Sequence, residues 1–132
     1  MWIYNNNELT TIPSEAYGYV YLITNKITNK KYIGKKLFWF IKQKTIKGKR
    51  KKIKVESDWR DYWSSSDEVK QDVKNLGEEN FIREILHICS NKGTCNYLEA
   101  KEQMLRLVLE SNEYYNNQIQ CRVSRSHIKS VI

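Results

Sequence analysis

Short apolar segments alternate with polar segments along the chain, and their spacing predicts both strands and helices. Residues 19–24 (YVYLIT) and 31–34 (KYIG) are rich in β-branched and aromatic residues and flank a polar stretch, which predicts a β-hairpin. Residues 37–55 begin apolar, become basic and end apolar, and they predict a second hairpin that turns near Gly48. The polar residues 5–16, which include the only proline, predict an irregular N-terminal arm.

Two helices and one further strand are predicted in the second half of the chain. Residues 65–68 (SSDE) have the spacing of a capping box, apolar residues follow at helical intervals, and Gly77 provides a stop. Residues 81–88 predict a strand, and residues 96–110 predict a longer helix with one apolar face. The leucines on that face are Leu98, Leu105 and Leu109.

This order of elements predicts the α+β class, with a small antiparallel or mixed sheet of about three strands flanked by helices. The length of 132 residues fits a single domain. We expect its core at about 18–117, an N-terminal arm at 1–16, a basic insert at 36–56 and a basic tail at 118–132.

The composition excludes several classes of protein. A hydrophobic content of 40% and an aromatic content of 12% are too high for a wholly disordered chain. The longest apolar runs, at 20–23 and 37–41, are far shorter than the roughly 20 residues that span a bilayer, so we expect no membrane partner. We find no secretory signal, and three cysteines are too few for a disulfide framework, so we expect a cytoplasmic protein.

The positive charge is concentrated in one segment. The net charge is +8, yet residues 35–54 hold ten Lys or Arg and no acid, which leaves 13 basic and 15 acidic residues elsewhere. A lysine run is often a solvated loop, but charge localised in this way suits a polyanion such as nucleic acid. The residues expected to bind nucleic acid are Lys36, Lys49, Arg50, Lys51, Lys52, Lys54, Arg122 and Arg125.

Two tyrosines are candidates for chemistry. Tyr21 and Tyr32 lie eleven positions apart on adjacent strands of the first predicted hairpin, so their hydroxyls could approach one another. An isolated pair of strand tyrosines is more often plain amphipathic surface. A nearby cation lowers the pKa of a tyrosine from its ordinary value of about 10, and Lys35 is well placed to do so.

The segments Tyr19-Val20-Tyr21 and Tyr32-Ile33-Gly34-Lys35 resemble the two-part signature of the GIY-YIG nuclease family, with a tyrosine at the family's first glycine. The predicted helix, strand and second helix that follow, with Glu99 and then Asn116, resemble the family's order of glutamate and terminal asparagine. The resemblance spans about residues 18–116. Residues 57–66 (SDWRDYWSSS) and the lysine-rich segment resemble a phage-type branch, similar to the Seg-type homing endonucleases.

The resemblance implies a metal-dependent DNA endonuclease that hydrolyses phosphodiester bonds, by nicking or by double-strand cleavage. Glu99 would bind Mg²⁺ or Mn²⁺, and the two tyrosines would hydrogen-bond water and phosphate, one of them as the general base. Arg60 takes the place of the family's arginine, with Arg50 as the alternative. The catalytic residues expected from the resemblance are Tyr21, Tyr32, Lys35, Arg60, Glu99 and Asn116.

Simpler explanations compete with these roles. Asn96 and Glu99 also have capping-box spacing, so Glu99 could serve only as a helix cap. Arg60 could form an ion pair with Asp58 or Asp61. A non-catalytic nucleic-acid-binding protein on the same scaffold, or a small RNA-binding accessory protein, would explain the charge equally well.

Two further groups of side chains are assigned to the core. Trp59, Tyr62 and Trp63 could stack on bases, but core packing is the more frequent role of such aromatics. His87, Cys89 and Cys95 lack the paired spacing of zinc ligands, so we expect no zinc.

Overall fold

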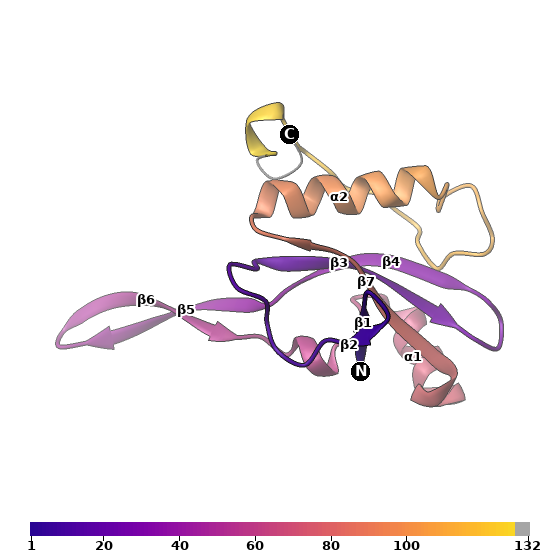
Figure 1. Cartoon of the computed structure of the whole chain (residues 1–132), viewed down its shortest axis with the longest axis horizontal. Coiled ribbons are helices and arrows are strands. Elements are labelled where there is room, and N and C mark those ends of the chain that lie inside the picture. The colour runs from indigo at the N-terminus through magenta and orange to yellow at the C-terminus, as the bar shows by residue number, and fades with distance from the viewer. Residues whose placement is uncertain (129–132) are drawn as a thin grey trace.

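The computed structural model describes residues 1–128 and shows a five-stranded mixed sheet with the strand order β2-β1-β7-β3-β4, together with a separate hairpin, β5-β6 (Figure 1). The strands are β1 (Trp2–Tyr4), β2 (Asn7–Glu8), β3 (Gly18–Asn25), β4 (Lys31–Leu37), β5 (Trp39–Ile46), β6 (Lys49–Glu56) and β7 (Phe81–Cys89). The helices are α1 (Asp67–Leu76) and α2 (Lys92–Leu105), with short 3₁₀ turns at Trp59–Asp61, Glu78–Asn80 and Arg125–His127. The α+β class is confirmed.

The first predicted hairpin and the predicted strand at 81–88 form the centre of the sheet. β3 pairs antiparallel with β4 on one side and with β7 on the other. In the β3–β4 register Tyr21 lies opposite Gly34, and Ile23 lies opposite Tyr32. Because successive residues of a strand point to opposite faces, Tyr21 and Tyr32 share one face of the sheet, whereas Lys35 belongs to the other.

The expectation of about three strands is wrong, because the N-terminus adds two short strands; of the expected irregular arm at 1–16, residues 9–16 carry no helix or strand. β1 pairs parallel with β7 and antiparallel with β2 across a turn at Asn5 and Asn6, which have φ of 50° and 66°. Trp2 is 1% exposed and donates a hydrogen bond from Nε1 to the Trp59 carbonyl at 2.6 Å. Burial of this tryptophan anchors the N-terminus, although a strand of three residues is too short to show a periodic pattern.

A helix covers each face of the sheet (Figure 1). On the face that carries Tyr21, the core joins aromatic side chains from the N-terminus, β3 and the 3₁₀ turn at Trp59–Asp61 with two valines of α1. On the other face, α2 covers a smaller core. The residues of the first core include Trp2, Tyr19, Tyr21, Phe38, Trp59, Val69 and Val73; those of the second include Val20, Leu22, Ile33, Cys89, Cys95 and Val108.

The first helix follows the sequence pattern, but the second does not. α1 is capped by the Ser66 side chain, which accepts a hydrogen bond from the Val69 amide at 3.3 Å, and it ends at Gly77 with φ of 94°. α2 begins four residues before the expected Asn96. Its buried face is made of Thr94, Cys95, Ala100 and Gln103, whereas Leu105 and Leu109 are exposed.

Of the expected face of leucines, Leu98 packs against the second core, and the expectation is wrong for Leu105 and Leu109. Small and polar side chains, which carry little hydropathy signal, let α2 approach the sheet instead. Among the described residues, no helix has the length and apolar character needed to cross a bilayer.

The expected second hairpin is present and projects away from the body of the molecule (Figure 1). Its strands pair from Trp39 opposite Glu56 to Ile46 opposite Lys49. The connecting residues Lys47 and Gly48 have φ of 51° and 76°, as a two-residue type I′ turn requires. Residues 129–132 of the expected basic tail lie outside the part of the chain that the structure describes.

Candidate active site

An open cavity of about 960 Å³ lies along the exposed edge of β4, between the start of α1, the middle of α2 and the segment that follows α2. It collects residues that are far apart in the sequence. Of the six expected catalytic residues, four line this cavity: Tyr32, Lys35, Glu99 and Asn116. Lys30, Ser65 and Gln103 also line it.

Glu99 lies on α2, two turns after the start of the helix, and does not cap it. The N-cap is Asn91, whose side chain accepts a hydrogen bond from the Thr94 amide at 2.9 Å, so the capping explanation for Glu99 is wrong. The Glu99 side chain is 14% exposed, and its ion-pair partner is the Lys35 ammonium at 3.9 Å. Burial raises the pKa of the Glu99 carboxyl, and the charge of Lys35 opposes this shift.

These properties fit a ligand of a hard divalent cation. A carboxylate that is held only by a long ion pair keeps its oxygens available, and a cation would offset the cost of its burial. Within residues 1–128, no three His, Cys, Asp or Glu side chains come together as a ligand cluster. Mg²⁺ is compatible with a single carboxylate, because it keeps several waters and takes phosphate oxygens of the substrate as ligands.

Lys35 faces Glu99 rather than the tyrosines. Its ammonium donates a hydrogen bond to the Asn96 side chain and forms the ion pair with Glu99. Lys36, which we expected to bind nucleic acid, lies on the tyrosine face of β4: its Nζ lies 4.2 Å from the centre of the Tyr62 ring and 2.6 Å from an Asp58 oxygen.

Hydroxyl groups connect the two motif tyrosines. Tyr21 is 1% exposed and hydrogen-bonds Tyr62, which also hydrogen-bonds Ser65. The Ser65 hydroxyl lies 3.4 Å from the Tyr32 hydroxyl at the cavity. Burial raises the pKa of Tyr21 far above its ordinary value, and the neighbouring Tyr62 adds to the shift. Tyr21 therefore stays protonated, and Tyr32 is the motif tyrosine that reaches the cavity.

The close packing of Tyr21 requires a glycine on the facing strand. A Cβ added at Gly34 would lie 2.6 Å from Tyr21 Cζ and 2.9 Å from Tyr32 Cε1, which is closer than carbon atoms pack. A glycine is therefore required at position 34 because two tyrosine rings occupy the space of a side chain, and not because of the backbone angles of Gly34.

We expect Gly34→Ala to lower the free energy of unfolding by about 1–3 kcal/mol, the usual cost of overpacking, and to weaken any activity that depends on Tyr32. Thermal unfolding checks the first part. Gly48→Asn at the hairpin turn is the control, because asparagine tolerates the positive φ of that position. An Ala variant as stable as the wild type would contradict the packing argument.

Asn116 holds the edge of β4. Its Oδ1 accepts a hydrogen bond from the Ile33 amide at 3.0 Å, and its Nδ2 donates one to the Ile33 carbonyl at 2.8 Å. Gln103 donates a further hydrogen bond to the same carbonyl at 3.1 Å. The side chain of Asn116 thus replaces a neighbouring strand next to Tyr32, which gives it a positioning role.

We expect Asn116→Ala to lower the free energy of unfolding by about 1–3 kcal/mol, because the buried Ile33 amide loses its acceptor. Asn117→Ala, at the exposed neighbour, should have little effect. Loss of cleavage without any loss of stability would instead show that Asn116 acts directly on the substrate.

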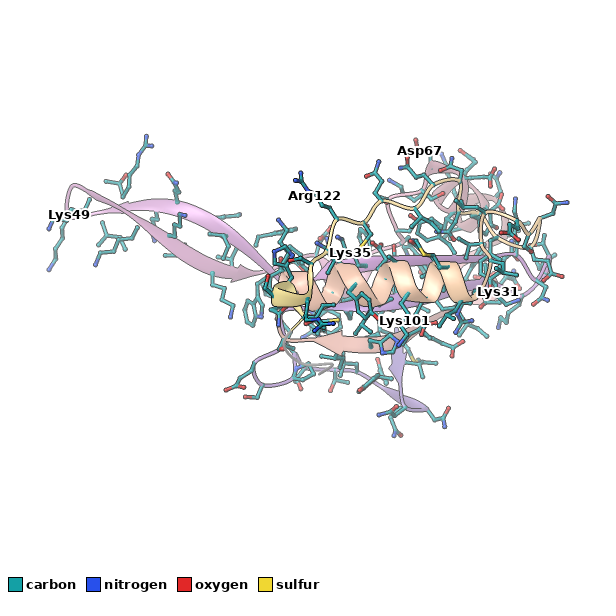
Figure 2. All side chains as sticks on the ribbon, turned by 90° about the horizontal axis from the view of Figure 1, so that it is seen from above. Lys31, Lys35, Lys49, Asp67, Lys101 and Arg122 are labelled. Carbon is teal, nitrogen blue, oxygen red and sulfur yellow. The ribbon has the colours of Figure 1, made fainter. Side chains whose placement is uncertain are left out.

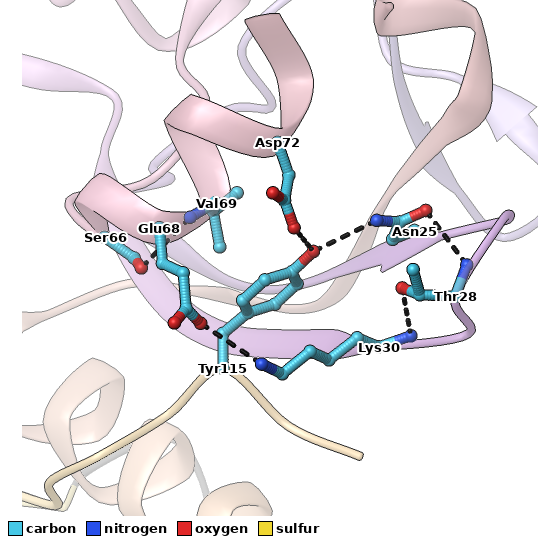
Figure 3. Close-up of polar contacts among 8 residues, drawn as sticks. All are labelled: Asn25, Thr28, Lys30, Ser66, Glu68, Val69, Asp72 and Tyr115. Atoms are coloured by element: carbon cyan, nitrogen blue, oxygen red, sulfur yellow. Dashed lines mark hydrogen bonds and ion pairs between the residues drawn. The ribbon is translucent and has the colours of Figure 1, made fainter. Parts of the chain in front are cut away.

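Tyr115 fixes the segment that carries Asn116 (Figure 3). Its hydroxyl donates a hydrogen bond to Asp72 of α1 at 2.6 Å and accepts one from Asn25 at 3.1 Å. Burial, together with the hydrogen bond to Asp72, raises the pKa of Tyr115 to about 12. Lys30 spans the same region and pairs with Glu68 of α1 at 3.2 Å. These contacts join α1, β4 and the segment after α2 into one wall of the cavity.

Arg60 is not brought into this cavity. Its Nε lies 3.1 Å from Glu56, its guanidinium donates to the Thr10 carbonyl, and it packs 4.5 Å from the centre of the Trp59 ring. The ion pair is formed with Glu56 rather than with Asp58 or Asp61. Arg50 lies near the hairpin turn. Among the described residues, the cations that line the cavity are Lys30 and Lys35.

The other residues expected to bind nucleic acid lie at two places. Figure 2 shows Lys49 at the far end of the hairpin, and Lys35 and Arg122 along one side of α2. Arg122 lines a second cavity, which shares Lys35 and Gln120 with the first; Arg125 lies in the last 3₁₀ turn and is exposed. The hairpin residues expected to bind nucleic acid, Lys49, Arg50, Lys51, Lys52 and Lys54, are all exposed, as are Lys42, Lys44 and Lys47 of the same hairpin.

Sequence reasoning did not predict that Tyr62 and Ser65 connect the two motif tyrosines. Tyr62 was assigned with Trp59 and Trp63 to the core or to base stacking, and Ser65 to a helix cap; Trp59 does belong to the core at 1% exposure. No spacing in the sequence indicates that the segment 57–66 folds over Tyr21, because the contacts between residues 21, 62 and 65 are non-local.

The comparison with protein-family models gives one match, described as "Putative endonuclease segE, GIY-YIG domain", over residues 2–119. No curated protein and no solved structure matches the chain significantly. The matched region contains both tyrosine motifs, Glu99 and Asn116, together with every strand and both α-helices. The chain therefore belongs to the SegE family of GIY-YIG endonuclease domains.

Proposed function

We propose that this protein is a metal-dependent DNA endonuclease, of the kind carried by phages and mobile elements, and that it cleaves at the cavity along β4. Membership of the family implies hydrolysis of phosphodiester bonds in a nucleic acid, and GIY-YIG nucleases typically use a divalent metal. The proposal rests on one observation: Glu99 of α2 and Tyr32 and Lys35 of β4 line the same cavity.

Each of these side chains has a separate role in the proposed mechanism. Glu99 holds Mg²⁺ or Mn²⁺, which, when bound, neutralises charge on the phosphate and stabilises the leaving oxygen. Tyr32, as its phenolate, would hydrogen-bond the attacking water and accept its proton as the general base, which returns the side chain to the neutral phenol. Lys35 keeps Glu99 ionised and, with Lys30, attracts the phosphate.

Tyr21 supports Tyr32 without touching the substrate. It is buried and stays protonated, so its hydroxyl acts as a fixed donor to Tyr62. Through Tyr62 and Ser65 it sets the position of the Tyr32 hydroxyl. This arrangement separates the two motif tyrosines into a positioning residue and a general base.

Cations outside the cavity bind the phosphates of the DNA backbone. We assign this role to the exposed lysines and arginine of the hairpin and to Arg122, which lies next to Lys35 in the second cavity. Such contacts carry no sequence information by themselves, so they fit a protein with slight sequence preference.

A plasmid-nicking assay with Mg²⁺, repeated with EDTA, tests the proposal. We expect conversion of supercoiled plasmid in the presence of metal and none with the chelator. Absence of cleavage under all metal conditions, with DNA binding retained, would favour the second candidate function, a non-catalytic DNA-binding protein. The position of Arg60 outside the cavity is the observation that favours this second candidate.

A further inference from the structure

The two faces of the hairpin β5-β6 carry different sets of cations. Side chains alternate between the faces along each strand, and residues directly opposite one another share a face. The register pairs Lys44 with Lys51 on one face and Thr45 with Arg50 on the other. By this register one face carries Lys42, Lys44, Lys49 and Lys51, and the other carries Arg50, Lys52 and Lys54.

Acidic side chains do not neutralise these charges. The only acid of the hairpin, Glu56, lies at the base and pairs with Arg60 at 3.1 Å. Within residues 1–128 none of the seven cations has an ion-pair partner, although Lys54 packs 4.7 Å from the centre of the Trp39 ring. Lys44 lies directly opposite Lys51, and like charges in this position are destabilising. The free energy that they cost the free protein would be recovered against a polyanion.

The shape of the hairpin limits what that polyanion can be. Each strand has eight residues and is therefore about 26 Å long, and Figure 2 shows the hairpin standing clear of the body. The major groove of B-DNA, about 12 Å wide, admits a two-stranded β-ribbon, whereas the minor groove, about 6 Å wide, does not. A hairpin with cations on one face would bind a single phosphate backbone. A hairpin with cations on both faces fits a groove that has a phosphate backbone on each side.

We propose that the hairpin β5-β6 inserts into the major groove of duplex DNA, with its two faces turned toward the two phosphate backbones that line the groove. The proposal rests on the proposed function, since it takes duplex DNA as the substrate. In this arrangement the hairpin recognises duplex structure on one side of the cleavage site.

Removing three cations from each face separately tests this arrangement. One variant combines Lys42→Gln, Lys44→Gln and Lys51→Gln; the other combines Arg50→Gln, Lys52→Gln and Lys54→Gln. Binding to a duplex longer than two helical turns is measured against salt without divalent metal, so that no cleavage occurs. We expect either variant to flatten the slope of log K against log salt by about two to three units, at about 0.9 for each lost contact.

The control is Lys74→Gln with Lys101→Gln, two exposed lysines on the helices. A flattened slope for one face only would mean that the hairpin lies against a single backbone, and unchanged slopes for both would mean that its lysines face solvent. Either result would overturn the proposal.

The choice of groove is tested by competition. Methyl green, which occupies the major groove, should displace the protein, whereas netropsin, which occupies the minor groove, should not. A single-stranded oligonucleotide of the same sequence should bind more weakly and lose less affinity in the two variants. Displacement by netropsin, or equal binding of single strands, would overturn groove insertion. Plasmid nicking by the wild type, with Mg²⁺ and with EDTA, tests the catalytic proposal separately, because these binding measurements contain no metal and involve no cleavage.

Discussion

Glu99→Gln is expected to abolish metal-dependent cleavage while DNA binding remains nearly intact. The amide keeps the size of the side chain but lacks the negative oxygen that a hard cation requires. A loss of about 10³-fold or more is expected, since metal stabilisation of the transition state supplies several kcal/mol. Burial also raises the pKa of Glu99. When the pH is lowered, wild-type cleavage should therefore begin to fall at a pH above about 4.3, the ordinary pKa of a glutamate.

Glu102→Gln is the matched control for this experiment. Glu102 lies one turn further along α2, is bound to Arg106 and His87 at 2.9 Å each, and does not line the cavity. This variant should cleave like the wild type and lose only stability. Plasmid nicking measures cleavage, and gel-shift titration measures binding. Normal cleavage by Glu99→Gln would show that Glu99 holds no essential metal.

Tyr32→Phe is expected to lower the cleavage rate by about 10²- to 10⁴-fold, the range of a lost general base. The variant keeps the ring that packs beside Gly34 and Tyr21, so thermal unfolding should change little. The rate is measured in single turnover at saturating DNA, where weaker binding does not contribute. Full activity would remove Tyr32 from the mechanism.

Tyr21→Phe separates positioning from catalysis. It removes a buried donor to Tyr62, so we expect both a lower stability and a lower rate. If Tyr32 is the base and Tyr21 only positions it, Tyr32→Phe should lose about 10²- to 10⁴-fold in rate and Tyr21→Phe should lose less. The control is Tyr97→Phe, whose ring lies beside Lys101 on α2 and outside the cavity. The reverse pattern would make Tyr21 the base.

Local patterns in the sequence carried much of the fold. The β3–β4 hairpin, β7 and α1 with its glycine stop are each encoded within a few adjacent residues, where strand-forming side chains, a cap or a turn residue act over short distances. The turn of the basic hairpin at Gly48 is of the same kind. The resemblance of the two tyrosine motifs added Glu99, Tyr32 and Lys35, which the structure places in one cavity.

Non-local contacts decided the remainder. β1 forms because Trp2 is buried against Tyr19, Tyr21 and Trp59. A strand of three residues is too short to be predicted from its own sequence pattern. The start of α2 depended on how small residues pack against the sheet rather than on the spacing of leucines.

Within the candidate site, the register of β4 decided which charge meets which partner. Lys35 and Lys36 are consecutive residues after Gly34, and neighbours on a strand point to opposite faces. Lys35 therefore contacts Glu99, whereas Lys36 contacts Tyr62. Arg60, placed at the site by its order in the chain, instead meets Glu56 and Trp59. The sequence by itself determined the kinds of side chain available for chemistry, and tertiary packing determined their partners, since burial and strand register arise only once distant segments meet.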